Sequence, residues 1–362
     1  MPSLTRIVLV LLLVATAALL SFLGPVDASA GAIITNGTVT LGVNDQGHLN
    51  VEGGPSFGGV GPTGLHFNAT GNDATSPGCL CEGWGVAIAT GSGSPFSGYA
   101  NIAVDGVVNV ALVSFTSTAS TATSVVNING ISSAPALQVT HFYHPSVSPN
   151  LYQVDVTIRN ISGGVLGDGP TALRYRRVMD WDIQPTANSE FVTINGLPAT
   201  NVLFASDDGF ETANPLTFVD GIPAGTPLDL AGCGFTTNFT DCGPADHGAL
   251  FDLSFPALDD GEERILRIFY GAASTEPEAD GARSDAGVGP FSYGQCDPLK
   301  EVTEPPLCDQ TTGTPNTFIF GFAGVGETPP PPPPPPIVPA PSTILLLGAG
   351  LIGLVVARHL MK

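Results

Sequence analysis

Near its middle the chain reads Leu151-Tyr152-Gln153-Val154-Asp155-Val156-Thr157-Ile158-Arg159-Asn160, and apolar and polar residues alternate from Val154 to Ile158. Successive side chains of a β-strand point to opposite faces, so this alternation predicts a strand with one buried face. Similar runs, many of them rich in Val, Ile, Thr and Phe, recur between clusters of Gly, Asn, Asp and Pro. They span residues 38–43, 84–90, 98–104, 107–118, 137–143, 171–183, 249–258 and 264–272.

Helical periodicity is weak between the two ends of the chain. No window of 12 or more residues there keeps a 3.6-residue apolar repeat. Regular strands with turns between them are typical of sandwiches and barrels. The sequence therefore predicts an all-β body over residues 31–326, built as one large two-sheet β-sandwich or as two smaller ones.

The composition limits the partners of this body. Acidic residues outnumber basic ones 32 to 11, so nucleic acid and anionic lipid are excluded as partners. The charge suits solubility at a cell surface, divalent-cation binding or a basic ligand. Because charged residues are only 12% of the chain, while Gly and Pro are abundant, the profile is that of an ordered, loop-rich β protein.

Both ends of the chain carry apolar segments. Residues 7–23 form an apolar stretch interrupted only by Thr16 and Ser21, and Ala28-Ser29-Ala30 offers an A-x-A cleavage site before Gly31, which predicts a signal peptide over residues 1–30. An uncleaved N-terminal anchor is the alternative. At the other end, the 16 residues from Ser342 to Ala357 would form a helix of about 24 Å.

That C-terminal helix is apolar all round, which favours a membrane span over a buried core helix. It is slightly shorter than the roughly 20 residues that usually cross a bilayer, and the flanking residues extend it. Arg358 and Lys362 follow it, and the positive-inside rule places them in the cytoplasm. Residues before Pro339 are therefore expected outside the inner membrane.

The polar stretch before this helix resembles the PEP-CTERM sorting signal of Gram-negative bacteria. The motif residues are Val338, Pro339, Ala340, Pro341, Ser342 and Thr343. The resemblance implies that an exosortase-type membrane protease processes the tail during export. Two positions depart from the pattern, because Ala340 stands where Glu is usual and His359 where a second Arg is common. Within the body, residues 173–182 and 314–322 resemble segments of uncharacterised exported bacterial proteins, which implies a shared β domain and no activity.

Together these features divide the chain into four parts. A signal peptide (1–30) precedes the β-rich body (31–326), a proline-rich stalk (327–338) and the sorting tail (339–362). The stalk holds eight consecutive prolines, which as polyproline II span about 25 Å. We expect the protein to be anchored by its C-terminal helix before processing and to reach the cell envelope or the exterior afterwards.

Six cysteines in an exported chain predict disulfides. Proximity in the sequence favours two pairs, Cys233–Cys242 and Cys296–Cys308. Cys79 and Cys81 then bond to each other or exchange partners with the rest. A C-x-C metal site is disfavoured because no His or second Cys pair lies nearby in sequence.

The densest set of polar residues is Leu-Arg-Tyr-Arg-Arg-Val-Met-Asp-Trp-Asp at 173–182. As a strand it would carry on one face Arg174, Arg176, Asp180 and Asp182. The aromatic Tyr175 and Trp181 fall on the other face. One interpretation is a carbohydrate or anion site with stacking aromatics. The favoured one is structural, because same-face residues about 6.6 Å apart pair more readily with neighbouring strands than with each other.

Paired carboxylates raise the alternative of a carbohydrate-active enzyme that uses Asp180, Asp182 or Glu190. A second acidic set is Asp207, Asp208 and Glu211, in which Asp207-Asp208-Gly209 fits a turn or a weak calcium loop. No P-loop or H-E-x-x-H motif is present, and no cofactor is predicted. We therefore predict a non-enzymatic surface protein that contacts extracellular polysaccharide or other surface components.

Overall fold

The alternating run at residues 151–160 forms strand β13 (Leu151–Asn160), with the predicted bounds. Tyr152, Val154, Val156 and Ile158 are fully buried, and the polar residues between them are half-buried or exposed. The computed structural model describes residues 31–327 except 57, 92, 94, 220–221, 224–228 and 301–307. The predicted signal peptide, the sorting tail and nearly all of the stalk lie outside the described residues.

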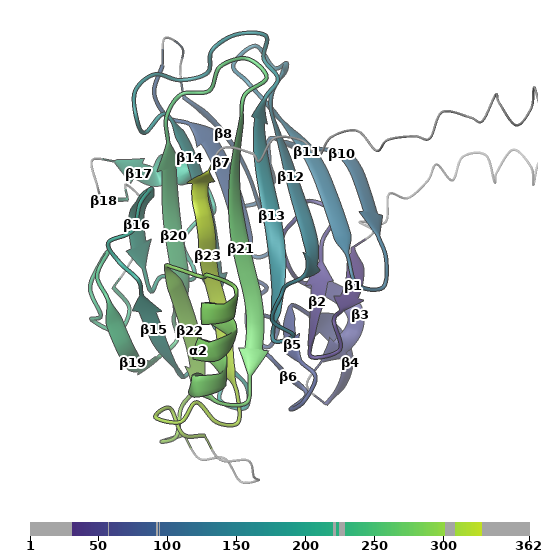
Figure 1. Cartoon of the computed structure of the whole chain (residues 1–362), viewed down its shortest axis with the longest axis vertical. Coiled ribbons are helices and arrows are strands. Elements are labelled where there is room, and N and C mark those ends of the chain that lie inside the picture. Colours follow the sequence, from purple (N-terminus) through teal and green to yellow (C-terminus); the bar gives the residue numbers. More distant parts are fainter. Residues whose placement is uncertain are drawn as a thin grey trace, which may run out of the picture. The chain divides into compact units, whose positions relative to one another are not determined.

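β13 is the fourth strand of a nine-stranded sheet in which every described pairing is antiparallel. In spatial order its strands are β10 (Val110–Ser117), β11 (Ala122–Asn129), β12 (Pro135–Pro145), β13, β21 (Glu263–Ala273), β23 (Thr317–Glu327), β22 (Phe291–Cys296), β15 (Glu190–Asn195) and β19 (Phe239–Ala245). The last strand in the sequence, β23, thus lies inside the sheet and pairs with β21 and β22 (Figure 1).

A second sheet has six antiparallel strands. Their order is β16 (Val202–Ser206), β20 (Gly248–Phe255), β14 (Leu173–Asp180), β7 (Gly83–Ile88), β8 (Phe96–Asn101) and β9 (Gly106–Val108). Side chains from both large sheets share one hydrophobic core. Phe251 of β20 meets Phe320 and Phe322 of β23 with ring centroids 5.7 and 5.2 Å apart. The two sheets therefore face each other across this core.

Smaller elements complete the described part of the chain. A four-stranded sheet contains β1 (Ala32–Thr35), β2 (Val39–Val43), β5 (Leu65–Phe67) and β6 (Asn72–Asp73). Two hairpin-sized sheets pair β3 (Val51–Ser56) with β4 (Gly59–Thr63), and β17 (Phe218–Val219) with β18 (Ile222–Pro223). A 3₁₀-helix, η1, spans Pro215–Thr217.

Helix α2 (Glu276–Asp285) lies over the outer face of the nine-stranded sheet (Figure 1). Thr275 caps its N-terminus, because the Thr275 side chain accepts from the Glu278 N–H while the Glu278 side chain accepts from the Ser274 N–H. Ala279 and Ala282 are its buried side chains. Small apolar residues at this spacing let the helix lie close to β21 and β23.

The mainly β prediction is confirmed, while several details differ. The run at 107–118 is divided between β9 and β10 at Asn109, whose φ of 55° breaks the extended backbone. Residues 259–262 lie in the connection from β20 of one large sheet to β21 of the other. The described residues form five sheets, two large and three small, where the sequence predicted one two-sheet sandwich or two smaller sandwiches.

Three disulfides are present in the described residues. They join Cys79–Cys81, Cys233–Cys242 and Cys296–Cys308, with Cα–Cα distances of 5.1, 6.0 and 5.7 Å. The two loop-closing pairs are those that sequence proximity favoured. The bond between Cys79 and Cys81 removes both thiolates that a C-x-C metal site would need.

Candidate functional site

The two faces of β14 are both buried, so its charged residues are enclosed rather than presented to solvent. Arg176 lies directly opposite Asp252 of β20 in the strand register. Its Nε and one terminal nitrogen each donate to an Asp252 carboxylate oxygen at 2.7 Å. Such pairing between neighbouring strands is what the structural interpretation of residues 173–182 predicted. Arg174, on the same face, is half-buried.

Arg177 points the other way, into the space between the two large sheets. It forms an ion pair with Glu82, which precedes β7, and both side chains are fully buried. The hydroxyl of Tyr270 from β21 donates to the same carboxylate at 2.8 Å, and Arg177 donates to the hydroxyl of Tyr143 from β12 at 3.2 Å. We call Glu82, Tyr143, Arg177 and Tyr270 the core ion-pair network, because they join the two sheets.

Trp181 is fully buried. Its indole N–H donates to the Ser292 hydroxyl at 3.0 Å. Its ring lies against Gly294 of β22, where an added Cβ would come within 2.8 Å of the indole. Trp181 therefore packs in the core and presents no ring to a sugar.

A compact acidic cluster lies where β14 ends. Asp180 is the last residue of the strand, Asp182 follows two residues later, and Asp246 precedes β20. One carboxylate oxygen from each lies within 4.8 Å of the other two. Asp180 and Asp182 are 1% and 0% exposed, whereas Asp246 is exposed. We call these three residues the acidic cluster.

The hydrogen bonds to the cluster are incomplete. Asn188 donates to one oxygen of Asp182 at 3.0 Å. The other Asp182 oxygen (Oδ2) and Asp180 Oδ1 are buried without a hydrogen-bond partner. Glu190, the first residue of β15, accepts from the Ile183 N–H through Oε1, while its Oε2 has no partner. Buried polar atoms are normally paired, so these oxygens stand out.

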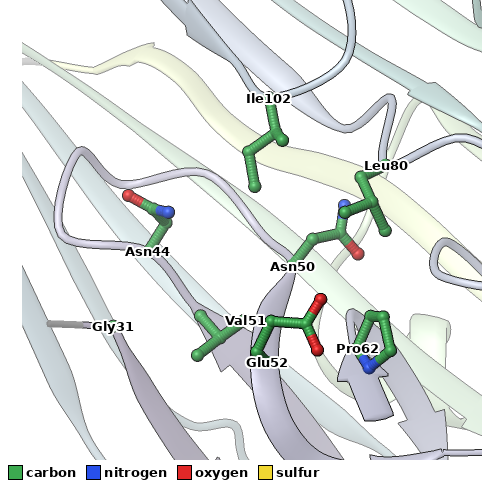
Figure 2. A pocket seen from close by; sticks show the side chains of 8 residues that line it. All are labelled: Gly31, Asn44, Asn50, Val51, Glu52, Pro62, Leu80 and Ile102. Carbon is green, nitrogen blue, oxygen red and sulfur yellow. The ribbon is translucent and has the colours of Figure 1, made fainter. Parts of the chain in front are cut away.

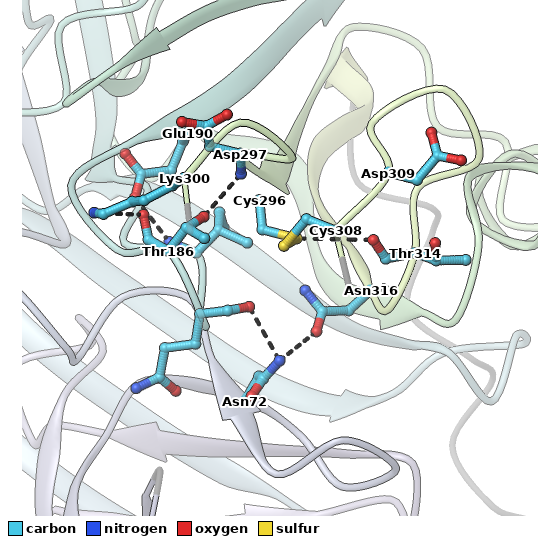
Figure 3. Close-up of a disulfide and its surroundings, with 12 residues drawn as sticks. Asn72, Thr186, Glu190, Cys296, Asp297, Lys300, Cys308, Asp309, Thr314 and Asn316 are labelled. Atoms are coloured by element: carbon cyan, nitrogen blue, oxygen red, sulfur yellow. Dashed lines mark hydrogen bonds between the residues drawn. A yellow bond between two sulfur atoms is a disulfide. The ribbon is translucent and has the colours of Figure 1, made fainter. Parts of the chain in front are cut away.

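The Cys296–Cys308 disulfide lies close to Glu190, since Glu190 is opposite Cys296 in the strand register (Figure 3). Lys300, from the loop that this disulfide closes, donates to the Ala187 carbonyl at 2.8 Å. Among the residues that the structure describes, no Arg, Lys or His forms an ion pair with Glu190 or with the acidic cluster.

Burial raises the pKa of these carboxyl groups because it disfavours their charged forms. It raises the pKa of both Asp180 and Asp182, and the charge of Asp246 adds to the rise for each. Burial raises the pKa of Glu190 to about 9, with the charges of Asp182 and Asp246 acting in the same direction. At neutral pH, part of this negative charge is therefore suppressed by bound protons.

Stability in metal-free buffer is expected to fall as the pH rises from 7 to 9. A carboxyl whose folded pKa exceeds its unfolded value of about 4 binds more protons when folded, and each such group changes stability by up to about 1.4 kcal/mol per pH unit. Burial lowers the pKa of His48 to about 3, so this side chain is neutral in the folded and the unfolded state between pH 7 and 9. We expect the melting temperature of Glu190→Gln to fall less steeply than that of the wild type. An equal slope in both proteins, with the half-buried Glu263→Gln as control, would contradict this assignment.

A pocket of about 430 Å³ lies elsewhere, beside the β3–β4 hairpin. Figure 2 shows Ile102 and Leu80 on one side of it and Glu52 and Pro62 on the other. Asn44 and Asn50 add amide groups. Its size and its mixture of apolar and polar side chains are typical of a small-ligand site.

The second acidic set does not converge on one site, because Asp207 lies 3.0 Å from His247 and Glu211 lies 3.8 Å from Arg176. The predicted signal, sorting and anchor residues lie outside the described residues, except Gly31, the first described residue. Residues 338–359 match the family model described as the PEP-CTERM protein-sorting motif. The chain carries a PEP-CTERM sorting motif. This motif marks it as an exported, C-terminally sorted exosortase substrate. Within the part of the chain that is described, no helix has the length and apolar character that crossing a membrane requires.

Comparison with other proteins adds distant similarities of fold. No curated protein matches the chain. A galactose mutarotase-like protein from Lactobacillus casei ATCC 334 is 11% identical with a TM-score of 0.32, and the match covers 83% of this chain and 91% of that one. A galactose mutarotase related enzyme from Lactobacillus acidophilus is 10% identical with a TM-score of 0.27, covering 83% of this chain and 100% of that one. Similarity this low assigns no activity.

The structure therefore separates the residues that the sequence grouped together. Arg176 pairs across strands, Trp181 packs in the core, and only Asp180 and Asp182 meet at a shared site. Asp246 was missed by the sequence reasoning. It lies more than sixty positions later, as an exposed residue in the two-residue connection between β19 and β20, and no local pattern connects it to the other two.

Proposed function

We propose that this protein is a non-catalytic component of the cell surface. It is an exported substrate of exosortase-type processing, which the sorting motif supports. In this proposal the C-terminal helix holds the chain in the inner membrane until the tail is processed. The β-rich body then remains in the envelope or the extracellular matrix, with the proline-rich stalk as its spacer.

The observation that carries the non-catalytic assignment is the enclosure of the carboxylates. A glycosidase needs two carboxyl groups that reach opposite sides of a sugar, 5 Å or more apart. Asp180, Asp182 and Glu190 are each no more than 1% exposed. Trp181 is buried as well, so no ring is available beside them for stacking. A sugar cannot enter this region without local unfolding.

Polysaccharide binding is a second candidate function, and the pocket beside the β3–β4 hairpin favours it. Asn44 and Glu52 offer hydrogen-bonding groups suited to sugar hydroxyls. Leu80 and Ile102 supply apolar surface for the faces of a sugar ring. None of the eight lining residues is aromatic, so weak binding is expected.

One experiment addresses both parts of the proposal. The full-length chain would be expressed in an exosortase-bearing Gram-negative host, beside a variant that lacks residues 338–362. We expect the complete chain to be processed and associated with the envelope, and the truncated one to stay unprocessed in the periplasm. Equal processing and location of the two proteins would contradict a role for the tail.

The exported protein would then be incubated with polysaccharide from the host surface. We expect retention on the polysaccharide without any increase in reducing ends, and a loss of about tenfold in affinity for Glu52→Ala, worth about 1.4 kcal/mol. Asp105→Ala, which removes an exposed carboxylate outside the pocket, is the matched control. Release of reducing ends that Asp182→Asn abolishes would instead establish a carbohydrate-active enzyme.

A further inference from the structure

The acidic cluster holds three carboxylates that three separate parts of the fold bring together. Asp180 ends β14, Asp182 lies in the segment that leads to β15, and Asp246 precedes β20. We propose that Asp180, Asp182 and Asp246 bind a divalent cation, and that calcium is the preferred ion. This site is independent of the polysaccharide pocket and of the sorting tail.

The spacing of the cluster fits a shared ion. Calcium is bound by oxygens at about 2.3–2.6 Å, so two oxygens on one ion lie at most about 5 Å apart. One oxygen from each of the three carboxylates lies within 4.8 Å of the others. Carboxylate oxygens are hard ligands, which suit calcium and magnesium rather than soft metals.

The unpaired oxygens are the second, independent observation. Asp180 Oδ1 and Asp182 Oδ2 are buried without a donor from any other group, and the two carboxyl groups contact each other, so that one proton can be shared between them. Asp180 Oδ2 lies 3.3 Å from the sulfur of Cys79, but a disulfide sulfur carries no hydrogen and cannot donate. Burying such oxygens without partners costs free energy, and a bound cation would offset that cost.

The described surroundings of the cluster supply no protein cation in its place. Across the described residues, no basic side chain forms an ion pair with the cluster. Lys300 donates to backbone carbonyls instead. Glu190 contributes a further buried oxygen without a partner. Asp246 is exposed, so an ion can enter from solvent past this residue.

Calcium fits better than magnesium for a physical reason. Magnesium demands near-ideal octahedral geometry and gives up its water reluctantly, whereas calcium accepts irregular sets of six to eight oxygens. The carboxylates here come from a strand end and two loops, and only Asp246 is exposed. Such an arrangement is irregular in geometry and partly shielded from solvent. Outside the cell, modules of this kind bind calcium with dissociation constants of about 10⁻⁴–10⁻³ M.

The test uses the exported full-length chain, stripped with EDTA and desalted. Thermal unfolding would be followed with added calcium chloride, magnesium chloride, or sodium chloride at the same ionic strength. With calcium at about 100 times its dissociation constant we expect the melting temperature to rise by about 5 °C in a saturable manner. Isothermal titration should give one site per chain.

Asp182→Asn is the decisive variant. It removes one of three clustered negative charges, so we expect it to melt in EDTA at the wild-type temperature or above, which shows that it folds. Its calcium affinity should fall at least about tenfold. Asp105→Asn removes an exposed carboxylate outside the cluster and should keep the full calcium response.

Two results would overturn the proposal. One is a wild-type melting temperature that calcium raises no more than sodium chloride does. The other is an Asp182→Asn variant that responds to calcium as the wild type does. Either outcome would mean that the clustered carboxylates are stabilised by protons alone. Neither would affect the sorting of the chain or its binding of polysaccharide.

Discussion

Glu82→Gln is expected to lower the free energy of unfolding by about 3–5 kcal/mol. The substitution leaves the Arg177 guanidinium fully buried between the two sheets without its counter-ion. It also weakens the hydrogen bond from Tyr270, which donates to the same carboxylate. Urea-induced unfolding of the exported protein, monitored by fluorescence, measures the loss.

The matched control is Glu263→Gln. Glu263 pairs with Arg159 at 3.8 Å, and both side chains are substantially exposed. Exposed pairs contribute between about 0 and 1 kcal/mol, so this variant should unfold close to the wild type. Equal losses for Glu82→Gln and Glu263→Gln would show that the core ion-pair network contributes no more than a surface pair.

Trp181→Ala should cost about 3–5 kcal/mol of stability, because it leaves a cavity between β14 and β22. The Ser292 hydroxyl would also lose its indole partner. Trp181→Phe keeps most of the volume and should cost less. Phe142→Ala is the control, since Phe142 is 38% exposed on the outer side of β12 and should cost under about 1 kcal/mol.

This comparison also separates the two interpretations of residues 173–182. A stacking platform for sugars would lose binding on Trp181→Ala while the protein kept its stability. If Trp181 is a core residue, its replacement lowers the stability of the protein. If Trp181→Ala unfolds at the same urea concentration as the wild type, the packing described for this indole is wrong.

The parts of the fold that sequence predicted best have one buried face. β13 was predicted to the residue because Val154, Val156 and Ile158 alternate with polar side chains. β15 and β22 were missed because buried polar residues, such as Glu190 and Ser292, interrupt their apolar pattern. Helix α2 buries only Ala279 and Ala282, which is too little apolar surface to give a periodic signal.

The candidate site was less predictable, for a different reason. The sequence placed Asp180 and Asp182 on one strand face, but β14 ends at Asp180, so Asp182 lies beyond the strand. The third carboxylate, Asp246, is brought close to the other two by tertiary folding. In the same way Glu82 meets Arg177 across 95 positions of the sequence. Contacts of this kind depend on the topology of the sheets, which local patterns do not encode.

The position of β23 has a consequence for how an exported chain can acquire its structure. This final strand is the hydrogen-bonded link between β21 and β22, so the two halves of the nine-stranded sheet cannot join until residues 317–327 have cleared the export channel. All of the chain except the stalk and the tail must therefore be translocated before the nine-stranded sheet can close. A later pull on the tail would act first on residues 322–327, which pair with β21 alone, and only then on residues 317–321, which pair with both neighbours.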